Sequence, residues 1–211
     1  SIEQQSIIDA IKAGKNLIID SVAGAGKTTT ALHITKTIFD LDNNFEESNN
    51  PNKTIFDNES SKLNSNRNVL ILTYNSRLKI DARLKVKKLG LTNVEVHSYH
   101  AFGVKYYGIE CRKDDGLINV CKQNSKPIKT IRFDVIILDE QQDMTKTFYK
   151  FIQKVLVDNQ IKNIQMCLFG DIFQNIYAFQ GSDDRFLKFG DRLFEDNNSD
   201  SNLWQNLKIS C

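Results

Sequence analysis

The chain has 211 residues, of which 40% are hydrophobic and 26% are charged, and its formal net charge is +2. This length suits one α/β domain, or one domain with a small insert, and excludes two domains of ordinary size. The composition is typical of soluble globular proteins, and no apolar run approaches the roughly 20 residues that a membrane-spanning helix needs. Because the charge is mild, any inference about nucleic acid must rest on motifs.

The N-terminus lacks the charged and apolar regions of a signal peptide, so we expect an intracellular protein, cytoplasmic or nuclear, with no membrane partner. Four cysteines, Cys111, Cys121, Cys167 and Cys211, show no CxxC or His-paired spacing. Neither a zinc site nor a disulfide framework is therefore supported, and we expect reduced thiols.

The pattern of apolar residues predicts helices that alternate with strands. A short helix over 2–12 precedes a strand at about 16–20, and a second helix runs to about residue 39. Further strands are expected at 69–73, 94–97, 133–138 and 164–169, with helices over 77–88, from about 98, and near 145–157. This alternation predicts an α/β fold with a parallel β-sheet flanked by helices, whose ligand lies at the carboxyl ends of the strands.

Two polar segments interrupt this pattern. Residues 40–68 are rich in Asn, Ser and charged side chains, and they cannot bury enough apolar surface to offset the entropy of ordering. We expect a long, flexible, Asn-rich loop there, and not a domain. Residues 108–130 are polar and irregular, with room only for a hairpin or a small subdomain.

The helix near residue 80 is expected to place Leu78, Ala82 and Leu84 on an apolar stripe. Its Lys and Arg residues fall elsewhere on the helix. They are interpreted as a solvated face.

The stretch Ser-Val-Ala-Gly-Ala-Gly-Lys-Thr-Thr-Thr at 21–30 links the first strand to the second helix and is typical of a phosphate-binding loop. Small residues let backbone N–H groups and the helix dipole face a polyphosphate. Lys27 would reach the terminal phosphates and Thr28 would hold Mg²⁺. The strict pattern has Gly where this chain has Ser21, and a Gly-rich turn that binds nothing is the alternative. The loop alone indicates ATP or GTP, with expected contacts at Ala23, Gly24, Ala25, Gly26, Lys27, Thr28 and Thr29.

A run of acidic and amide residues, Asp-Glu-Gln-Gln-Asp at 139–143, follows the apolar strand at 133–138. A carboxylate at the tip of a buried strand beside such a loop can hold Mg²⁺, which we assign to Asp139, while Glu140 can polarise an attacking water. Adjacent acids repel unless a cation or donors offset them. The alternative is an acidic helix start without chemistry.

In this order, the motifs resemble those of the UvrD/Rep-like branch of superfamily 1 DNA helicases, over nearly all of the chain except 40–68 and 108–130. The resemblance implies the first RecA-like P-loop NTPase domain, called 1A. Glu3-Gln4 is similar to the Q motif, which makes Gln4 the reader of the adenine edge. Thr73-Tyr74-Asn75 resembles a motif whose Thr and Asn touch single-stranded DNA. Ser98-Tyr-His-Ala-Phe102 resembles the Thr-Phe-His box, which places His100 at the DNA.

The most specific resemblance is Gly-Asp-Ile-Phe-Gln-Asn-Ile-Tyr-Ala-Phe-Gln-Gly at 170–181. In the family this motif joins the two ligands, so Gln174 would sense the γ-phosphate while Tyr177 and Phe179 pack near a DNA base. Stacking on an aromatic ring is worth roughly 1 to 3 kcal/mol per base and tolerates any sequence. The alternative is that both rings belong to the core.

The chain departs from the family pattern at three places. Gln180 stands where Arg is common, Thr29 and Thr30 stand where an Arg often covers the adenine, and the chain stops where the next motif is expected to begin, at 207–211. The second RecA-like domain and its arginines are thus missing. Because arginine fingers contribute on the order of 10³ to 10⁵ in rate in P-loop systems, we expect the isolated chain to hydrolyse ATP weakly.

The resemblance implies ATP and Mg²⁺ as cofactors, and single-stranded DNA and single/double-strand junctions as partners. The implied reaction is ATP hydrolysis coupled to 3′ to 5′ translocation and duplex unwinding. The direction rests on Ile-Tyr-x-Phe after Gln174, where the oppositely directed branch usually has Leu-Pro. A truncated or decayed single-strand-binding module without motor activity is the alternative, and a P-loop kinase or GTPase is a third possibility.

Overall fold

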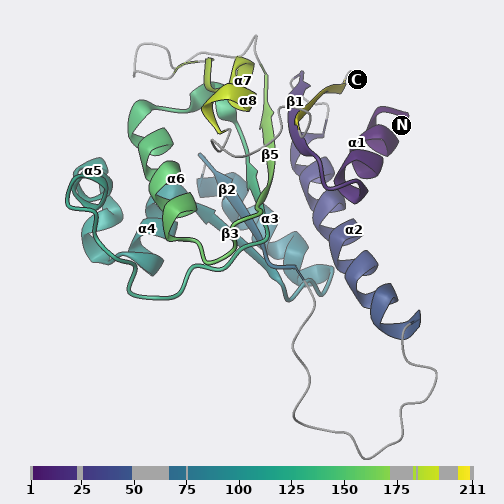
Figure 1. Ribbon diagram of the computed structural model, residues 1–211, viewed down its shortest axis with the longest axis horizontal. Coiled ribbons are helices and arrows are strands. Elements are labelled where there is room, and N and C mark those ends of the chain that lie inside the picture. Colours follow the sequence, from purple (N-terminus) through teal and green to yellow (C-terminus); the bar gives the residue numbers. More distant parts are fainter. Residues whose placement is uncertain are drawn as a thin grey trace, which may run out of the picture.

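A computed structural model describes residues 2–22, 26–48, 67–74, 76–171, 183, 185–194 and 204–209. Within this part of the chain the expected parallel sheet is confirmed, with six strands in the order β3-β2-β4-β5-β1-β6 (Figure 1). Every pair of neighbouring strands is parallel. The strands are β1 (Asn16–Ser21), β2 (Val69–Thr73), β3 (Val94–Ser98), β4 (Val135–Leu138), β5 (Gln165–Gly170) and β6 (Trp204–Ile209).

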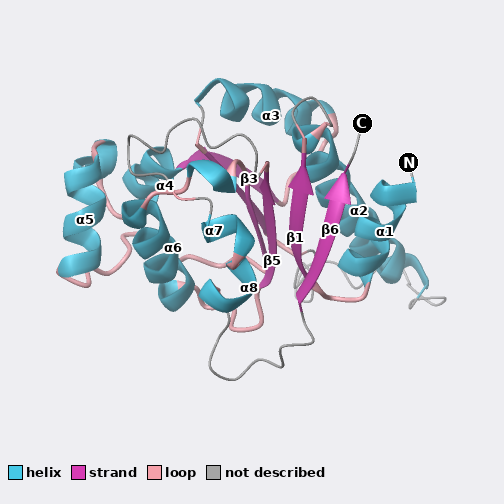
Figure 2. Ribbon diagram, turned by 90° about the horizontal axis from the view of Figure 1, so that it is seen from above, coloured by secondary structure: helices cyan, strands magenta, loops and turns pink. Residues whose placement is uncertain are grey.

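Helices cover both faces of the sheet (Figure 2). Successive side chains of a strand point to opposite faces, so the apolar runs of the central strands supply two hydrophobic cores. One core joins Ile71 and Ile137 to α1, α2 and α3, and the other joins Leu72 and Leu138 to α4, α5 and α6. The helices are α1 (Ile2–Lys12), α2 (Lys27–Ser48), α3 (Ser76–Lys88), α4 (Tyr99–Tyr106), α5 (Asp114–Lys122), α6 (Lys146–Asp158), α7 (Arg185–Lys188) and α8 (Gly190–Leu193). None of the helices in the described ranges is long and apolar enough to cross a membrane.

The order of the strands arranges the candidate site. β1 leads into the phosphate-binding loop, and β4 leads into the acidic run. β5 lies between them, paired with both. Because the strands are parallel, their carboxyl ends meet at one edge of the sheet. The start of the segment 170–181 therefore lies between the two halves of the expected nucleotide site.

The second helix is longer than its sequence indicated. It was expected to end near residue 39, but α2 continues to Ser48, so a flexible loop is wrong for residues 40–48. Lys36 pairs with Asp40 one turn later. The backbone N–H of Arg67 donates to the Asp42 carboxylate at 2.8 Å, which fixes the helix to the returning chain. Residues 49–66 lie outside the described ranges, where the expected loop stays a prediction.

The segment 108–130 holds a 3-10 turn and the helix α5 over its first part, so the hairpin alternative is wrong. A 3-10 turn at Ile109–Arg112 leads into α5, and Leu117 and Val120 of α5 are buried in the core on the α4 and α6 side. Gly116 allows this packing, because a Cβ there would lie 1.9 Å from the carbonyl oxygen of Glu110.

The apolar stripe of α3 is also corrected. Leu84 is 62% exposed, whereas Ala82 and Val86 are buried against the sheet. Ala82 and Val86, four positions apart, make this contact. Arg83 does not belong to a purely solvated face, because its Nε donates to the Val96 carbonyl of β3 at 2.6 Å. A further strand, β6, was not anticipated: it pairs with β1 along its whole length and forms an edge of the sheet.

Candidate nucleotide-binding site

The phosphate-binding loop connects β1 to α2, as expected. Gly26 has a φ of +80°, a backbone conformation that favours glycine, and α2 begins at Lys27. The side chain of Ser21, which replaces the usual Gly, is buried, and its hydroxyl donates to the carbonyl oxygen of Gly170 at 3.4 Å. Ser21 therefore ties the loop strand to β5. Ala23, Gly24 and Ala25 lie outside the described residues.

Lys27 and Glu140 form an ion pair across the site. The Lys27 Nζ lies 3.0 Å from the Glu140 Oε2, and the side chains are only 10% and 20% exposed. Glu140 holds a left-handed backbone, with a φ of 54°, which is costly for a residue with a Cβ. The structure therefore brings two of the three expected catalytic side chains together, with the lysine charge matched by the glutamate.

Asp139 is buried behind this pair, at the end of β4. Its backbone N–H donates to the Leu72 carbonyl at 2.9 Å, and its Oδ1 accepts from the Glu140 N–H at 3.0 Å. Burial, aided by the neighbouring charge of Glu140, raises the pKa of the Asp139 carboxyl to about 7, although Lys27 opposes this rise. Burial and Glu140 also raise the pKa of Asp143 to about 6.

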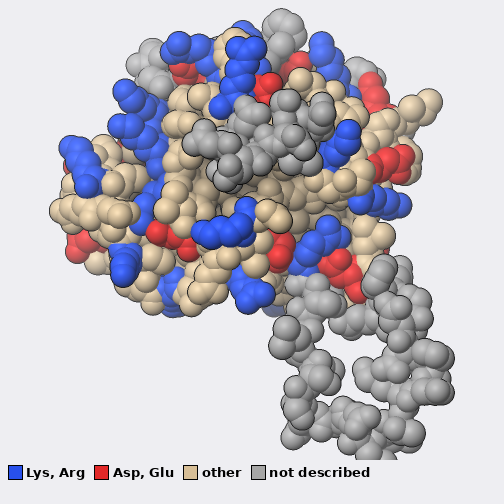
Figure 3. All heavy atoms as spheres, viewed as in Figure 1, with Lys and Arg blue, Asp and Glu red and all other residues tan. Residues whose placement is uncertain are grey.

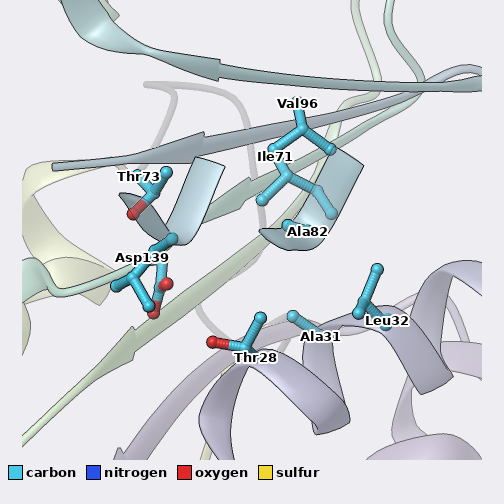
Figure 4. Close-up of a pocket in the computed structure, with 9 residues that line it drawn as sticks. Thr28, Ala31, Leu32, Ile71, Thr73, Ala82, Val96 and Asp139 are labelled. Carbon is cyan, nitrogen blue, oxygen red and sulfur yellow. The ribbon is translucent and has the colours of Figure 1, made fainter. Parts of the chain in front are cut away.

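The donor set suits a hard cation such as Mg²⁺. Thr28 and Asp139 line one small cavity, and their oxygens point toward each other in Figure 4. Within the described ranges no group of three or more His, Cys, Asp or Glu could hold a metal by itself. Mg²⁺ commonly takes one or two protein oxygens together with phosphate oxygens and waters. Thr28 and Asp139 would be its protein ligands.

Gln142 is a site residue that the motif reading did not single out. It is buried, its Nε2 donates to the Glu140 Oε2 at 2.7 Å, and its Oε1 accepts from the Asp171 N–H at 3.0 Å. A Cβ on Gly170 would lie 2.8 Å from this Oε1, so glycine makes room for the contact. Gln142 thus links Glu140 to the start of the segment 170–181. A polar residue so close to a buried strand was the available signal.

His100 lies on α4 near the carboxyl edge of the sheet. Its Nε2 is 2.8 Å from the Asp114 Oδ1, and its ring packs edge-on against Phe148, 5.5 Å between centroids. Tyr74 packs edge-on against the same ring at 5.9 Å, and Tyr99 stacks on it at 4.5 Å. The two candidate DNA motifs at 73–75 and 98–102 thus meet in one aromatic cluster around Phe148.

The other expected contacts are only partly placed. Gln4 is half-buried in the first turn of α1, and Thr29 is exposed on α2. Thr73 is 2% exposed and lines the small cavity with Thr28 and Asp139, so its side chain lies beneath the surface. The expected roles of Asn75, Gln174, Tyr177, Phe179 and Gln180 fall outside the described residues.

On the face that Figure 3 shows, the described basic side chains do not gather into one track for nucleic acid. On the face seen in Figure 3, Lys and Arg are spread over the surface with Asp and Glu among them. This agrees with the mild net charge of +2. The assignment of a DNA-binding surface therefore depends on the motifs and the aromatic cluster.

The parallel sheet, the Gly-Lys-Thr loop and the Asp-Glu pair at the end of β4 define a RecA-like P-loop NTPase domain. A family described as AAA domain matches residues 4–180, and the chain belongs to this family. This match confirms the P-loop NTPase family, and the superfamily 1 helicase type inferred from the motifs is taken up as a proposal below. Its nucleotide-binding character follows from the same loop.

Solved structures of Pif1 helicases resemble the chain. A Pif1 structure on unwinding at forked double-stranded DNA is 16% identical and matches 99% of this chain and 43% of that chain, with a TM-score of 0.48. Pif1 from Candida albicans is 14% identical and matches 99% of this chain and 39% of its own chain, with a TM-score of 0.47. Pif1 from Bacteroides in complex with ADP-AlF3 and single-stranded DNA is 18% identical and matches 82% of this chain and 32% of its own chain, with a TM-score of 0.42. These likenesses concern the fold alone, and the chain spans less than half of those chains. No curated protein matches the sequence.

Proposed function

We propose that the chain is motor domain 1A of a DNA helicase, which couples ATP hydrolysis to 3′ to 5′ movement along single-stranded DNA and to duplex unwinding. The carrying observation is the position of β5 between β1 and β4. The segment 170–181 therefore begins between the phosphate-binding loop and the acidic run. Gln142 joins its beginning to the acidic run, because it hydrogen-bonds both the Asp171 N–H and the Glu140 carboxylate. A segment placed there can respond to the nucleotide and pass the response to DNA.

In this proposal, Lys27 and Gln174 contact the terminal phosphate, and Thr28 and Asp139 hold Mg²⁺. Glu140 polarises the attacking water. The ion pair between Lys27 and Glu140 then describes the empty domain. A γ-phosphate would attract Lys27 and release Glu140 toward water, while Gln142 keeps hold of the carboxylate.

On the DNA side, His100, Asn75, Tyr177 and Phe179 contact the strand. The cluster around Phe148 supports this part of the proposal, because it brings His100 and Tyr74 to the carboxyl edge of the sheet. A second RecA-like domain would supply arginines to the γ-phosphate, and two domains must close around ATP for a step along DNA. A DNA-associated, intracellular location follows from the same proposal.

Two kinds of experiment test this proposal. Binding of a fluorescent ADP analogue is measured on the 211-residue chain, and ATPase and unwinding are measured on the full-length gene product. Lys27→Ala should abolish ADP binding. Lys36→Ala, which changes an exposed lysine of the same helix, is the matched control. Glu140→Gln should retain binding and lose turnover. If both site variants leave turnover intact, the site assignment fails.

The direction of movement and the motor activity have separate outcomes. Unwinding from 5′ to 3′ would overturn the UvrD/Rep-like branch but retain the motor. DNA-stimulated binding of ATP without turnover in the full-length gene product would favour the single-strand-binding module. ATPase activity that single-stranded DNA leaves unchanged would favour a P-loop kinase or GTPase.

A further inference from the structure

Thr73 stands beside Asp139 at the carboxyl edge of the sheet. β2 and β4 pair with Leu72 opposite Leu138, and the Asp139 N–H donates to the Leu72 carbonyl at 2.9 Å. The residues that follow, Thr73 and Asp139, are therefore at the same level. Both line the cavity to which Thr28 contributes from the start of α2, and Figure 4 shows the oxygens of all three on one side of it.

The hydroxyl of Thr73 is buried and unpaired within the part of the chain that the structure describes. The side chain is almost fully buried, and its Oγ1 has no hydrogen-bond partner among the residues that the structure describes. The rest of the cavity wall is mostly apolar, with Ala31, Leu32 and Ile71 among its members. Because an unpaired buried hydroxyl costs free energy, a valine of the same shape would suit the empty domain better.

We propose that Thr73 is a further residue of the metal site, whose hydroxyl accepts a hydrogen bond from a water molecule of the nucleotide-bound Mg²⁺. This rests on the proposed nucleotide site and assigns Thr73 to the nucleotide side instead of the DNA side. Mg²⁺ usually keeps several waters, and these need acceptors within the protein. Asp139 and Thr28 occupy the direct ligand positions. The hydroxyl of Thr73 is the neighbouring oxygen along the edge of the sheet.

Thr30 provides a matched control. Its hydroxyl is also buried without a partner among the described residues, and it belongs to α2, but it does not line this cavity. A substitution of Thr30 by Val removes the same group from a similar environment. It should therefore reproduce any effect on folding and none on the cation.

The test uses the 211-residue chain and its Thr73→Val, Thr73→Ser and Thr30→Val variants. Affinity for a fluorescent ADP analogue is measured in EDTA and in Mg²⁺, and Mn²⁺ binding at saturating ADP is followed by electron paramagnetic resonance. For Thr73→Val we expect ADP affinity in EDTA within twofold of the parent, and Mg²⁺ enhancement and Mn²⁺ affinity lower by about 5- to 10-fold. Thr73→Ser and Thr30→Val should stay within twofold in both conditions.

Thermal unfolding without metal separates this role from a structural one. Thr73→Val should unfold at the parent temperature or above it, because the lost hydroxyl has no partner. A lower unfolding temperature together with weaker binding in EDTA would overturn the proposal in favour of a packing role. Unchanged Mg²⁺ enhancement in Thr73→Val would also overturn it. Absence of ADP binding by the parent chain would instead refute the proposed nucleotide site.

Discussion

Replacing Asp139 by Asn is expected to stabilise the metal-free domain, and to do so more at pH 8 than at pH 5. Burial raises the pKa of this carboxyl from 3.8 to about 7 in the folded chain. Between these values the folded protein keeps a proton that the unfolded chain has released. Stability contributed by this group therefore falls as the pH rises from about 4 to about 7, and Asn removes this loss.

The magnitude follows from the difference between the two pKa values. A shift of about 3 units corresponds to about 4 kcal/mol at pH 8, and to less than half of that at pH 5. For a chain of this size the larger value corresponds to an increase of roughly 8 to 16 °C in the unfolding temperature. Asn keeps an oxygen that can accept the Glu140 N–H, so the backbone contact survives.

This effect is measured by urea unfolding at both pH values. Circular dichroism and the fluorescence of the single tryptophan, Trp204, report the unfolding. Asp81→Asn, which changes an exposed carboxylate on α3, serves as the control and should change stability little at either pH. The same Asp139→Asn variant should lose the Mg²⁺-dependent part of its ADP affinity. Equal stabilisation at pH 5 and pH 8, or destabilisation at pH 8, would refute the reasoning.

Three further substitutions test other parts of the structure. Gln142→Leu removes the amide between Glu140 and β5, so turnover by the full-length gene product should fall at least about tenfold while ADP affinity stays within threefold; unchanged turnover would argue against the link. Asn159→Ala leaves the backbone N–H and carbonyl of Phe133 unpaired, with an expected loss of about 2 to 4 kcal/mol in urea unfolding, and a loss below 1 kcal/mol would contradict this. Gly116→Ala places a Cβ 1.9 Å from the Glu110 carbonyl oxygen and should cost at least about 2 kcal/mol by the same measurement, and an unchanged stability would contradict this close approach.

The sheet was readable because its central strands are short, continuous apolar runs. Val69–Thr73 and Val135–Leu138 are buried along their whole length, and apolar runs so short and so rich in Val and Ile favour strands covered on both faces. The phosphate-binding loop and the acidic run follow such strands directly. Sequence alone could therefore place Lys27, Asp139 and Glu140 at one edge.

The features that the sequence did not predict depend on contacts between residues far apart in the chain. The extension of α2 involves Asp42 bonding to Arg67, and no local pattern announces that pair. β6 alternates weakly and is half-exposed, so it lacks the apolar run that marks the inner strands. The orientation of Thr73 into the cavity depends on the register of β2 against β4, which is known only once the strands are paired.

The edge strand β6 also determines where anything joined to it must emerge. It runs parallel to β1 with Ser21 opposite Ile209, so its carboxyl end is level with the start of the phosphate-binding loop. A module tethered there by a short connection would be held near the phosphates at an effective concentration of roughly millimolar. Such a neighbour could deliver a positive side chain to the nucleotide with little affinity of its own, and could swing away without leaving the molecule.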